Sequence, residues 1–329
     1  MMADERKRLR AAIAGAGSIG VAFAIVFARA GWQVVLFDPD PARRSAALRE
    51  VRDRLDDLQA FDLLDDLPGA IAARVRVSDE LADAVADADL VQECAPERVE
   101  LKRELFAAID AAAPPGAVVA SASSFLPASA YAGELPGRGR CLVAHPGNPP
   151  YLIPVIEIVP APFTEPAVVE RAQALFRSAG LSPIRVRKEI EGFVFNRLQG
   201  AVLREAYCLV RDGVASVEDI DTVMRDGLGL RWNFIGPFET ADLNTRGGIE
   251  SHASKMGPSY ERMGAERGQR DPWTPELVEK VAAQRRAALP LDQWDERVRW
   301  RDRMLMRLVR HRKGGREPWP PGAPPEAQG

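Results

Sequence analysis

Histidine is rare in this sequence, and one of the three histidines lies where it could move a proton. His145 follows the apolar run 142–144 and begins the proline-rich segment 145–150 (HPGNPP), so we expect it at the end of a strand, where loops carry chemistry. His252 lies in a glycine-rich polar stretch and His311 lies near the carboxyl-terminal end, which makes both weaker candidates. A buried structural histidine is the alternative interpretation of His145 taken alone.

The second candidate is Glu157, which stands alone within the apolar run 155–159 (VIEIV). Burying an unpaired carboxylate costs several kcal/mol, so Glu157 needs a cationic or hydrogen-bond-donating partner. Two strands joined by the proline-rich segment could bring it beside His145, twelve residues earlier. A carboxylate bonded to one imidazole nitrogen fixes the tautomer and makes the ring more basic, which leaves the other nitrogen to accept a proton. The pair suits removal of a hydroxyl proton, unless Glu157 is an edge-strand residue that faces water.

A glycine-rich turn earlier in the chain suits a dinucleotide beside this pair. It fits the pattern G-x-G-x-x-G between a predicted strand and a predicted helix, and it comprises Gly15, Ala16, Gly17, Ser18, Ile19 and Gly20. The first glycine permits the tight turn, the second lets the backbone approach a pyrophosphate, and the third allows close helix–strand packing. The free N–H groups at the start of the helix would then face the phosphates.

Asp38 ends the next predicted strand, where a carboxylate can accept hydrogen bonds from an adenosine ribose. Because this carboxylate would repel a 2′-phosphate, the sequence favours NAD over NADP. As alternatives, Arg43 and Arg44 could hold a 2′-phosphate, although we expect them to be solvated, and Asp38 could only cap the helix that follows Pro39. With NAD alongside, the histidine–carboxylate pair would take the hydroxyl proton during hydride transfer.

The elements that would position these residues alternate between strands and helices over the first half of the chain. We expect strands at 11–14, 33–37, 74–77, 90–91, 117–120, 142–144, 155–159 and 184–186. We expect amphipathic helices between them at 40–60, 80–87, 97–112 and 166–179. This alternation predicts an α/β fold with a Rossmann-type, doubly wound and mostly parallel sheet that helices cover on both faces.

After about residue 188 the pattern changes to helices alone, expected at 191–212, 216–228, 274–289 and 292–312. Ser216 and Asp219 have the spacing of a capping box, which marks a helix start. We therefore expect a dinucleotide-binding domain over 1–188 and an all-α carboxyl-terminal domain over 189–312. A tail over 313–329, rich in proline and glycine, is predicted to be disordered.

The composition, 46% hydrophobic and 28% charged over 329 residues, is ordinary for a globular protein. The net charge of −3 predicts no nucleic-acid partner, and three widely spaced cysteines argue against both a disulfide framework and a metal site. Residues 1–30 have features of a secretory signal peptide, but glycines interrupt their apolar run and a second apolar run follows it. No other stretch approaches a membrane span, so we expect a cytoplasmic protein without a membrane partner.

These residues together resemble the L-3-hydroxyacyl-CoA dehydrogenase family. The resemblance runs from about residue 11 to residue 245 and rests on the glycine-rich turn, Asp38, the segment 121–124 (SASS), His145 with Asn148 and Pro149, Glu157, and the segment 192–197 (GFVFNR). It implies a Rossmann-type NAD-binding domain followed by a helical domain that dimerises, so we expect a homodimer. It also implies that His145 is the general base and that Glu157 is its orienting carboxylate.

The same resemblance assigns five further residues. Ser124 and Asn196 would contact the substrate oxygens and help to place the nicotinamide, while Glu97, Lys102 and Asn148 would lie near the cofactor. The residues themselves leave two alternatives open, since Ser124 could only cap a turn and Lys102 could lie on the solvated face of a charged helix. Asn196 falls within a predicted helix, where asparagine is a poor helix former, and this supports a role in the site.

Two stretches are closer to the lambda-crystallin branch of the family, 145–154 (HPGNPPYLIP) and 226–237 (DGLGLRWNFIGP). The known activity of that branch is the oxidation of L-gulonate at carbon 3. Arg231, in the second stretch, offers a planar fork for a substrate carboxylate, unless it only bonds helix-end carbonyls. We predict an NAD-dependent dehydrogenase of a small 3-hydroxy acid such as L-gulonate or a carnitine-type acid. The alternatives are a dehydrogenase of 3-hydroxyacyl-CoA esters and a non-catalytic, crystallin-like NAD-binding protein.

Overall fold

The computed structural model describes residues 8–233, 235–244, 248–267, 276, 287 and 290–314. The chain forms two compact units. The first comprises the residues up to Asn196 together with those from Val298 onward, and the second comprises Arg197–Arg297. The domain boundary expected at residue 188 stays a prediction.

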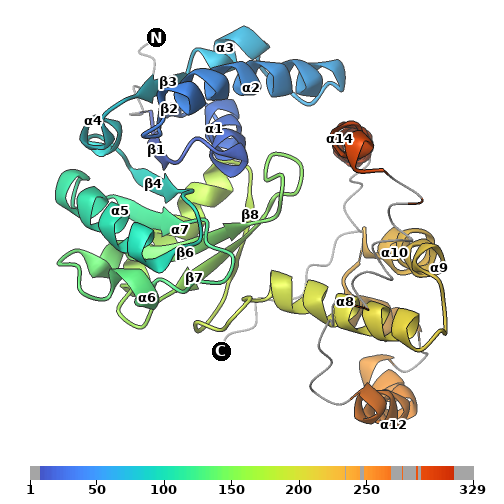
Figure 1. The fold of residues 1–329 in the computed structure, drawn as a ribbon. Coiled ribbons are helices and arrows are strands. Elements are labelled where there is room, and N and C mark those ends of the chain that lie inside the picture. Colours follow the sequence, from blue (N-terminus) through green and yellow to red (C-terminus); the bar gives the residue numbers. More distant parts are fainter. Residues whose placement is uncertain are drawn as a thin grey trace, which may run out of the picture. The chain divides into compact units, whose positions relative to one another are not determined.

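The first unit is built on one eight-stranded sheet in the order β3-β2-β1-β4-β5-β6-β7-β8 (Figure 1). Its strands are β1 (Arg10–Ala14), β2 (Gln33–Phe37), β3 (Val75–Ser78), β4 (Leu90–Glu93), β5 (Val118–Ser121), β6 (Cys141–Pro146), β7 (Val155–Pro160) and β8 (Ser182–Arg185). Neighbouring strands are parallel except β6 and β7, which are antiparallel. The predicted strands are all present, with ends shifted by at most two residues, and the mostly parallel Rossmann-type architecture is confirmed.

The strand order reverses beside β1, because the chain first proceeds to β2 and β3 on one side and then to β4 on the other. In open parallel sheets, ligands bind at the carboxyl ends of the strands next to such a reversal. The turns that follow β1, β2, β4 and β5 therefore surround the crevice where a dinucleotide is expected.

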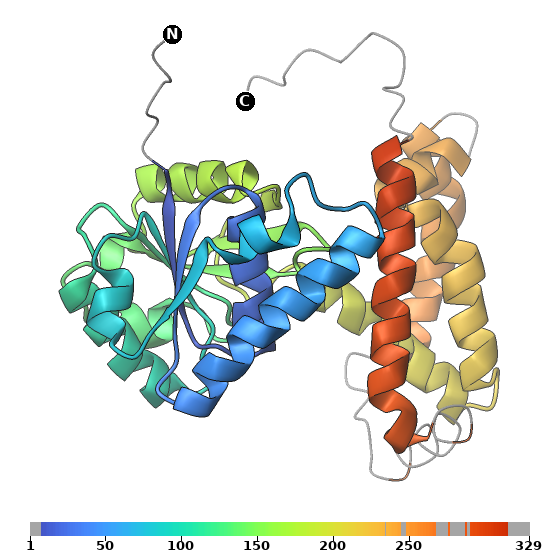
Figure 2. The same ribbon diagram turned by 90° about the horizontal axis from the view of Figure 1, so that it is seen from above.

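Helices cover both faces of the sheet (Figure 1 and Figure 2). The helices α1 (Ser18–Arg29), α2 (Pro41–Ala60), α3 (Pro68–Ala72) and α7 (Pro166–Ser178) contribute to one buried apolar cluster. The helices α4 (Leu81–Val85), α5 (Val99–Ala112) and α6 (Ser129–Ala132) contribute to another, and a short 3-10 helix, η1 (Arg138–Arg140), precedes β6. The four helices expected at 40–60, 80–87, 97–112 and 166–179 are present as α2, α4, α5 and α7, whereas α3 and α6 were not predicted.

The apolar run after β1 forms α1, as predicted, and its residues from Gly20 to Ala28 are all buried. The ring of Phe27 lies 5.0 Å from that of Trp32 and 6.1 Å from that of Phe176, measured between centroids. Aromatic contacts at these distances stabilise a core beyond the burial of apolar area. This helix is apolar nearly all round because the sheet and other helices enclose it.

The described part of the second unit is helical. α8 (Phe195–Arg211) leads into it, and α9 (Val217–Thr222), the π-helix η2 (Val223–Leu228), α10 (Gly229–Trp232), α11 (Pro237–Asn244) and α12 (Gly248–Arg267) follow. The predicted capping box is confirmed, because the Ser216 hydroxyl accepts the Asp219 N–H at 3.1 Å and the Asp219 carboxylate accepts the Ser216 N–H at 3.4 Å. The helix predicted over 274–289 lies outside the described residues apart from 276 and 287.

The last described helix returns to the first unit. α14 (Trp294–Gly314), which follows the 3-10 helix η3 (Leu291–Gln293), matches the helix predicted over 292–312, but from Val298 onward it groups with the first unit and not with the helical domain. The reason is packing, since Met306 is 2% exposed and belongs to the apolar cluster on the α1 side of the sheet. Of the predicted tail over 313–329, only the end of α14 lies within the described residues.

Within the described part of the chain, no helix is long and apolar enough to cross a membrane. The same residues contain no group of three or more histidine, cysteine, aspartate or glutamate side chains that could hold a metal ion. None of the three cysteines, all of which lie within the described residues, forms a disulfide, and Cys141 and Cys208 are buried.

Candidate active site

The glycine-rich turn joins β1 to α1 at the carboxyl edge of the sheet. Gly15 has a φ of +115°, and a Cβ there would lie 2.8 Å from the carbonyl carbon and oxygen of Cys94. A Cβ at Gly20 would lie 1.9 Å from the Gly15 oxygen, so the helix can approach the turn this closely only without a side chain. By contrast, a Cβ at Gly17 would meet nothing within 4 Å, which leaves the backbone open where a pyrophosphate would approach.

Asp38 directly follows β2, and its carboxylate faces the glycine-rich turn. One oxygen accepts the Ala16 N–H at 2.8 Å and the other accepts the Asp40 N–H at 3.0 Å. The cap of α2 is Asp40, whose carboxylate accepts the Ala42 N–H at 2.8 Å, so the interpretation of Asp38 as the helix cap is wrong. A carboxylate at this end of β2 is placed to accept from a ribose hydroxyl.

The two nearby arginines are already engaged. The Arg43 guanidinium bonds the Glu50 carboxylate at 2.9 Å and the Ala16 carbonyl oxygen. The Arg44 guanidinium donates to the Asp38 carbonyl oxygen at 2.6 Å. These contacts weaken the alternative that the two arginines hold a 2′-phosphate.

Glu97 follows β4 and fastens the turn that follows β5. Its carboxylate accepts the Ser123 hydroxyl, the N–H groups of Phe125 at 3.1 Å and Leu126 at 3.0 Å, and the Ser124 N–H at 3.4 Å. Partial burial raises the pKa of Glu97, but the hydrogen bonds from Ser123, Leu126 and Phe125 outweigh it and leave the pKa below its ordinary value. Glu97 is therefore a carboxylate at neutral pH and holds the Ser124 turn in place.

Lys102, in α5, lies inside the protein and not on a solvated face. It is 1% exposed, and its ammonium lies 2.8 and 2.9 Å from the two carboxylate oxygens of Glu93, the last residue of β4. The alternative that Lys102 belongs to a solvated helix face is therefore wrong. Its predicted role near the cofactor stays a prediction.

His145 and Glu157 lie directly opposite each other on the antiparallel strands β6 and β7. The Glu157 carboxylate oxygen Oε2 accepts from His145 Nδ1 at 2.7 Å, and the two residues are 6% and 1% exposed. Among the described residues, nothing hydrogen-bonds to His145 Nε2. Such a pair fixes the imidazole with its proton on Nδ1 and leaves Nε2 able to accept another.

The other oxygen of Glu157 is anchored by the start of α8. Oε1 accepts the N–H groups of Val194 at 2.8 Å and of Phe195 at 2.9 Å. The preceding Gly192 and Phe193 have φ values of 73° and 47°, a left-handed turn that is uncommon for a phenylalanine and aims these N–H groups at one point. Glu157 therefore orients the histidine and holds the amino end of a helix with the same carboxylate.

Asn196, in the first turn of α8, meets the Ser124 turn. Its side-chain nitrogen Nδ2 donates to the Ser124 carbonyl oxygen at 3.2 Å. Within the described residues, the Ser124 hydroxyl has no hydrogen-bond partner. The structure thus brings Ser124, Asn196, Glu157 and His145 into one connected group, as the sequence predicted, and Asn196 lies at a helix start and not inside a helix.

Two further predicted residues have exposed side chains. Asn148 is exposed in the segment that follows β6. Arg231 is exposed in α10 of the second unit, and its role toward a substrate stays a prediction.

Two family models cover most of the chain. The 3-hydroxyacyl-CoA dehydrogenase NAD binding domain matches residues 10–190, and the C-terminal domain of the same enzymes matches residues 192–290. The chain belongs to the 3-hydroxyacyl-CoA dehydrogenase family. The resemblance drawn from the residues is confirmed. As a member of this family, the chain is an NAD-dependent oxidoreductase that acts on a CH–OH group.

Relatives of this 3-hydroxyacyl-CoA dehydrogenase family member carry different names. The lambda-crystallin homolog of Bos taurus is 42% identical over 306 residues, 91% of this chain and 94% of that protein. The L-carnitine dehydrogenase of Nocardiopsis dassonvillei is 42% identical over 272 residues, 81% of this chain and 79% of that protein. The solved structure of 5-formyl-3-hydroxy-2-methylpyridine 4-carboxylic acid 5-dehydrogenase, an NAD+-dependent dismutase, has a TM-score of 0.80 and 32% identity, covering 94% of this chain and 100% of that one.

The crevice of this family member fits NAD. The close approaches at Gly15 and Gly20, the open backbone at Gly17 and the carboxylate of Asp38 are the features that a dinucleotide with a free ribose 2′-hydroxyl requires.

Some residues that shape the site were not predicted from the sequence. They are Glu93 and Ser121, which surround the Lys102 ammonium, and the N–H groups of Val194 and Phe195. For Glu93 a signal was present, because it is a single carboxylate that comes two residues after the apolar run 90–91 and directly before Cys94. Backbone N–H groups carry no such signal, since every residue except proline has one.

Proposed function

We propose that this family member oxidises the 3-hydroxyl of a small 3-hydroxy acid, such as L-gulonate or a carnitine-type acid, with NAD as the oxidant. The observation that carries the proposal is the buried 2.7 Å hydrogen bond between His145 and Glu157 at the carboxyl end of β6, beside a dinucleotide crevice. A purely structural, crystallin-like role needs neither a buried carboxylate nor an imidazole nitrogen left without a partner.

In this mechanism His145 Nε2 takes the proton of the substrate hydroxyl while Glu157 stabilises the charge that develops on the ring. NAD, when bound, supplies the acceptor for the hydride that leaves carbon 3. The free Ser124 hydroxyl and the Asn196 side chain hold the substrate oxygen in line with the base. Glu97 and Asn148 help to bind the cofactor, and Lys102 does the same while it stays paired with Glu93.

The substrate class rests on Arg231 and on the names of relatives. A guanidinium captures a carboxylate through two parallel hydrogen bonds, and a free 3-hydroxy acid presents a carboxylate where a CoA ester presents a thioester. One relative is named for L-carnitine and another for a pyridine carboxylic acid, which supports a small acid as the substrate. The second candidate, a 3-hydroxyacyl-CoA ester, is favoured by the family models and by a relative, 37% identical over 91% of this chain, that is named 3-hydroxyacyl-CoA dehydrogenase.

A substrate panel tests the proposal. Free 3-hydroxy acids and one 3-hydroxyacyl-CoA are incubated with NAD, and NADH is followed by its absorbance. We expect turnover of free acids to exceed that of the ester. Turnover of the ester well above that of every free acid would refute the substrate class but leave the dehydrogenase chemistry intact.

Substitution of Arg231 sharpens the same test. Arg231→Lys keeps the charge but loses the planar fork. For free acids, the fall in kcat/KM should correspond to a loss of transition-state stabilisation on the order of 2–3 kcal/mol, whereas kcat/KM for an ester should change little. The matched control is Arg225→Lys, an exposed arginine of the same unit that bonds Asp226. Equal effects of the two substitutions would contradict the proposed role of Arg231.

We also propose that the chain is a homodimer through its helical unit. Among the described residues of this unit, six large apolar side chains are at least 60% exposed, namely Leu198, Val214, Val223, Leu230, Phe238 and Leu243. Exposed apolar residues in such number favour an interaction surface. Light scattering should give twice the mass of the chain, and Phe238→Glu should lower that mass. A wild-type monomer at micromolar concentration would contradict this proposal.

A further inference from the structure

One carboxylate inside the first unit lies outside the proposed chemistry. Glu93, the last residue of β4, is fully buried, and its two oxygens accept four hydrogen bonds. Oε1 accepts the Ala95 N–H at 2.6 Å and the Lys102 ammonium at 2.9 Å, and Oε2 accepts the same ammonium at 2.8 Å and the Ser121 hydroxyl. No lone pair of this carboxylate needs a further partner.

The lysine of this pair is equally occupied. Besides Glu93, its ammonium lies 3.3 Å from the Ser121 hydroxyl oxygen and 3.5 Å from the Ala95 carbonyl oxygen. A buried ion pair is a weak source of stability, because two apolar side chains of similar volume would usually serve as well. The pair therefore calls for an explanation in terms of geometry.

The pair joins two turns of the dinucleotide crevice. Glu93 and Ser121 are register partners at the carboxyl ends of β4 and β5. On one side, Glu93 accepts the Ala95 N–H and so fixes the start of the turn after β4. On the other, Ser121 donates to Glu93 and accepts the Ser123 N–H at 3.1 Å, which fixes the turn after β5.

These are the two turns that carry the site residues. The first leads to Glu97 and the second to Ser124, and Glu97 itself bonds the N–H groups of the second turn. The first turn also supports the glycine-rich turn, because Gly15 packs against the Cys94 carbonyl, next to the Ala95 N–H that Glu93 holds. Two turns around the crevice are thus bonded to a single buried carboxylate, and the third packs against one of them.

We propose that Glu93, neutralised by Lys102, is a positioning residue that sets the geometry of the NAD crevice and of the Ser124 turn. It acts through Ala95 and Ser121, and touches neither cofactor nor substrate itself. The inference rests on the proposed function only for the part that concerns turnover, since cofactor binding can be measured without any substrate.

The test removes the charges without removing the volume. In the double variant Glu93→Gln/Lys102→Met, no charge is left unpaired in the interior, so the midpoint of thermal unfolding should stay within a few degrees of the wild-type value. We expect the affinity for NADH to weaken by about tenfold and kcat to fall by about tenfold to a hundredfold, because misplaced turns misalign the reacting groups. A merely structural pair would leave both quantities unchanged in the folded variant.

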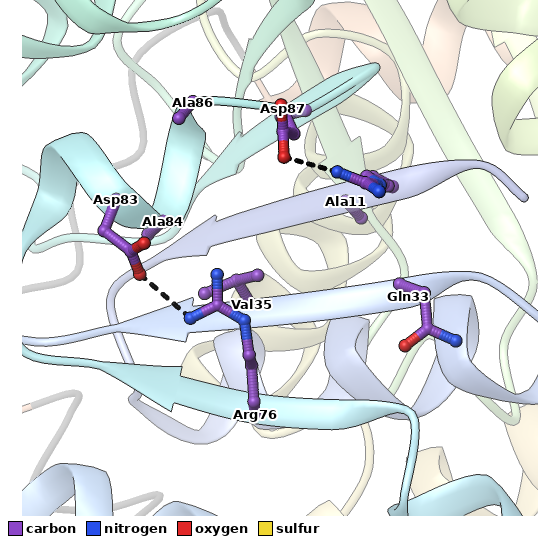
Figure 3. A pocket seen from close by; sticks show the side chains of 10 residues that line it. Ala11, Gln33, Val35, Arg76, Asp83, Ala84, Ala86 and Asp87 are labelled. Atoms are coloured by element: carbon purple, nitrogen blue, oxygen red, sulfur yellow. Dashed lines mark hydrogen bonds and ion pairs between the residues drawn. The ribbon is translucent and has the colours of Figure 1, made fainter.

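An exposed ion pair of the same unit serves as the matched control. Figure 3 shows Arg76 of β3 and Asp83 of α4 beside a pocket, with Gln33, the first residue of β2, nearby. A guanidinium nitrogen of Arg76 lies 2.9 Å from a carboxylate oxygen of Asp83, and the two side chains are 57% and 56% exposed. Arg76→Met/Asp83→Asn should leave NADH affinity and kcat unchanged, since exposed pairs contribute little.

A second variant separates the role of Glu93 from any cofactor contact of Lys102, and it also decides the question if the double variant fails to fold. Ser121→Ala keeps both charges paired and removes the hydroxyl that links Glu93 to Ser123, so kcat should fall by about tenfold while NADH affinity changes less. A folded double variant, or a folded Ser121→Ala, with wild-type kcat and NADH affinity would overturn the inference. If no hydroxy acid is turned over by the wild type, the proposed substrate fails, and the NADH affinities still test the role of Glu93.

Discussion

Replacement of Glu157 by glutamine tests the histidine–carboxylate pair sharply, because the two oxygens of this side chain face different partners. One accepts the N–H groups of Val194 and Phe195, and the other accepts from His145 Nδ1. Glutamine has only one accepting oxygen, which must face the two backbone donors. Its NH2 group then faces His145, because the opposite orientation would set it against two N–H groups.

The expected loss of activity follows from this constraint. The imidazole has to accept at Nδ1 and carry its proton on Nε2, the nitrogen that should take the proton of the substrate. To restore the productive tautomer, the hydrogen bond between the glutamine NH2 and Nδ1 must break, and two donors then face each other in a buried site. Together with the lost charge assistance, this costs about 3–5 kcal/mol. This corresponds to a decrease in kcat of about 10²–10⁴. The two backbone bonds at the start of α8 remain but lose charge assistance, about 1 kcal/mol of stability.

The assay combines NADH absorbance for kcat, NADH fluorescence for cofactor affinity and thermal unfolding. We expect cofactor affinity to stay within about twofold, since Glu157 touches neither the glycine-rich turn nor Asp38. His145→Gln is the matched control, because it should lower kcat further and leave the anchoring of α8, and hence the unfolding midpoint, unchanged. A Glu157→Gln enzyme that keeps more than about a tenth of kcat would refute the reasoning.

Three other results are expected. NAD should be preferred over NADP by at least about tenfold, or ~1.4 kcal/mol, because of Asp38, and equal use of both cofactors would count against that placement. Because the pKa of Glu97 is below its ordinary value, the stability this carboxylate contributes is fully present above about pH 4.3 and is lost as the pH falls further. The difference in unfolding midpoint between wild type and Glu97→Gln should thus be constant from about pH 7 to 5 and shrink below about 4, and a difference that already changes near pH 6 would contradict this. Gln92 of β4 is fully buried, and neither of its amide atoms has a partner among the described residues, so Gln92→Met should stabilise the protein by about 1–3 kcal/mol in denaturant unfolding, whereas a clear loss would show that the amide is bonded in solution.

The sheet could be predicted from the sequence because its strands are short apolar runs separated by amphipathic helices. The 20-residue helix α12 could not, since it contains Pro258 and the glycines Gly248, Gly257 and Gly264, and its stretch shows no apolar periodicity. Packing can hold such a sequence in a helix where local preference does not favour one.

The candidate site was predictable to the extent that side-chain chemistry identifies it. An isolated carboxylate in an apolar strand and a histidine one strand earlier were sufficient to predict the pair of His145 and Glu157. The burial of Lys102 was not predictable, because a lysine in a charged helix carries no sign of which face the helix presents to the sheet. The left-handed turn at Phe193 was equally hidden, since phenylalanine shows no preference for that conformation.

The return of α14 to the first unit affects how the chain folds as the ribosome makes it. Met306 lies in a core whose other members come from residues before 197, and the whole of Arg197–Arg297 is synthesised in between. At translation rates of about 5–20 residues per second, this interval lasts on the order of 5–20 s. During that time the nucleotide-binding unit lacks one of its core side chains and exposes the apolar surface that Met306 later covers. The first unit leaves the ribosome first, but its core is complete only after α14 has been synthesised.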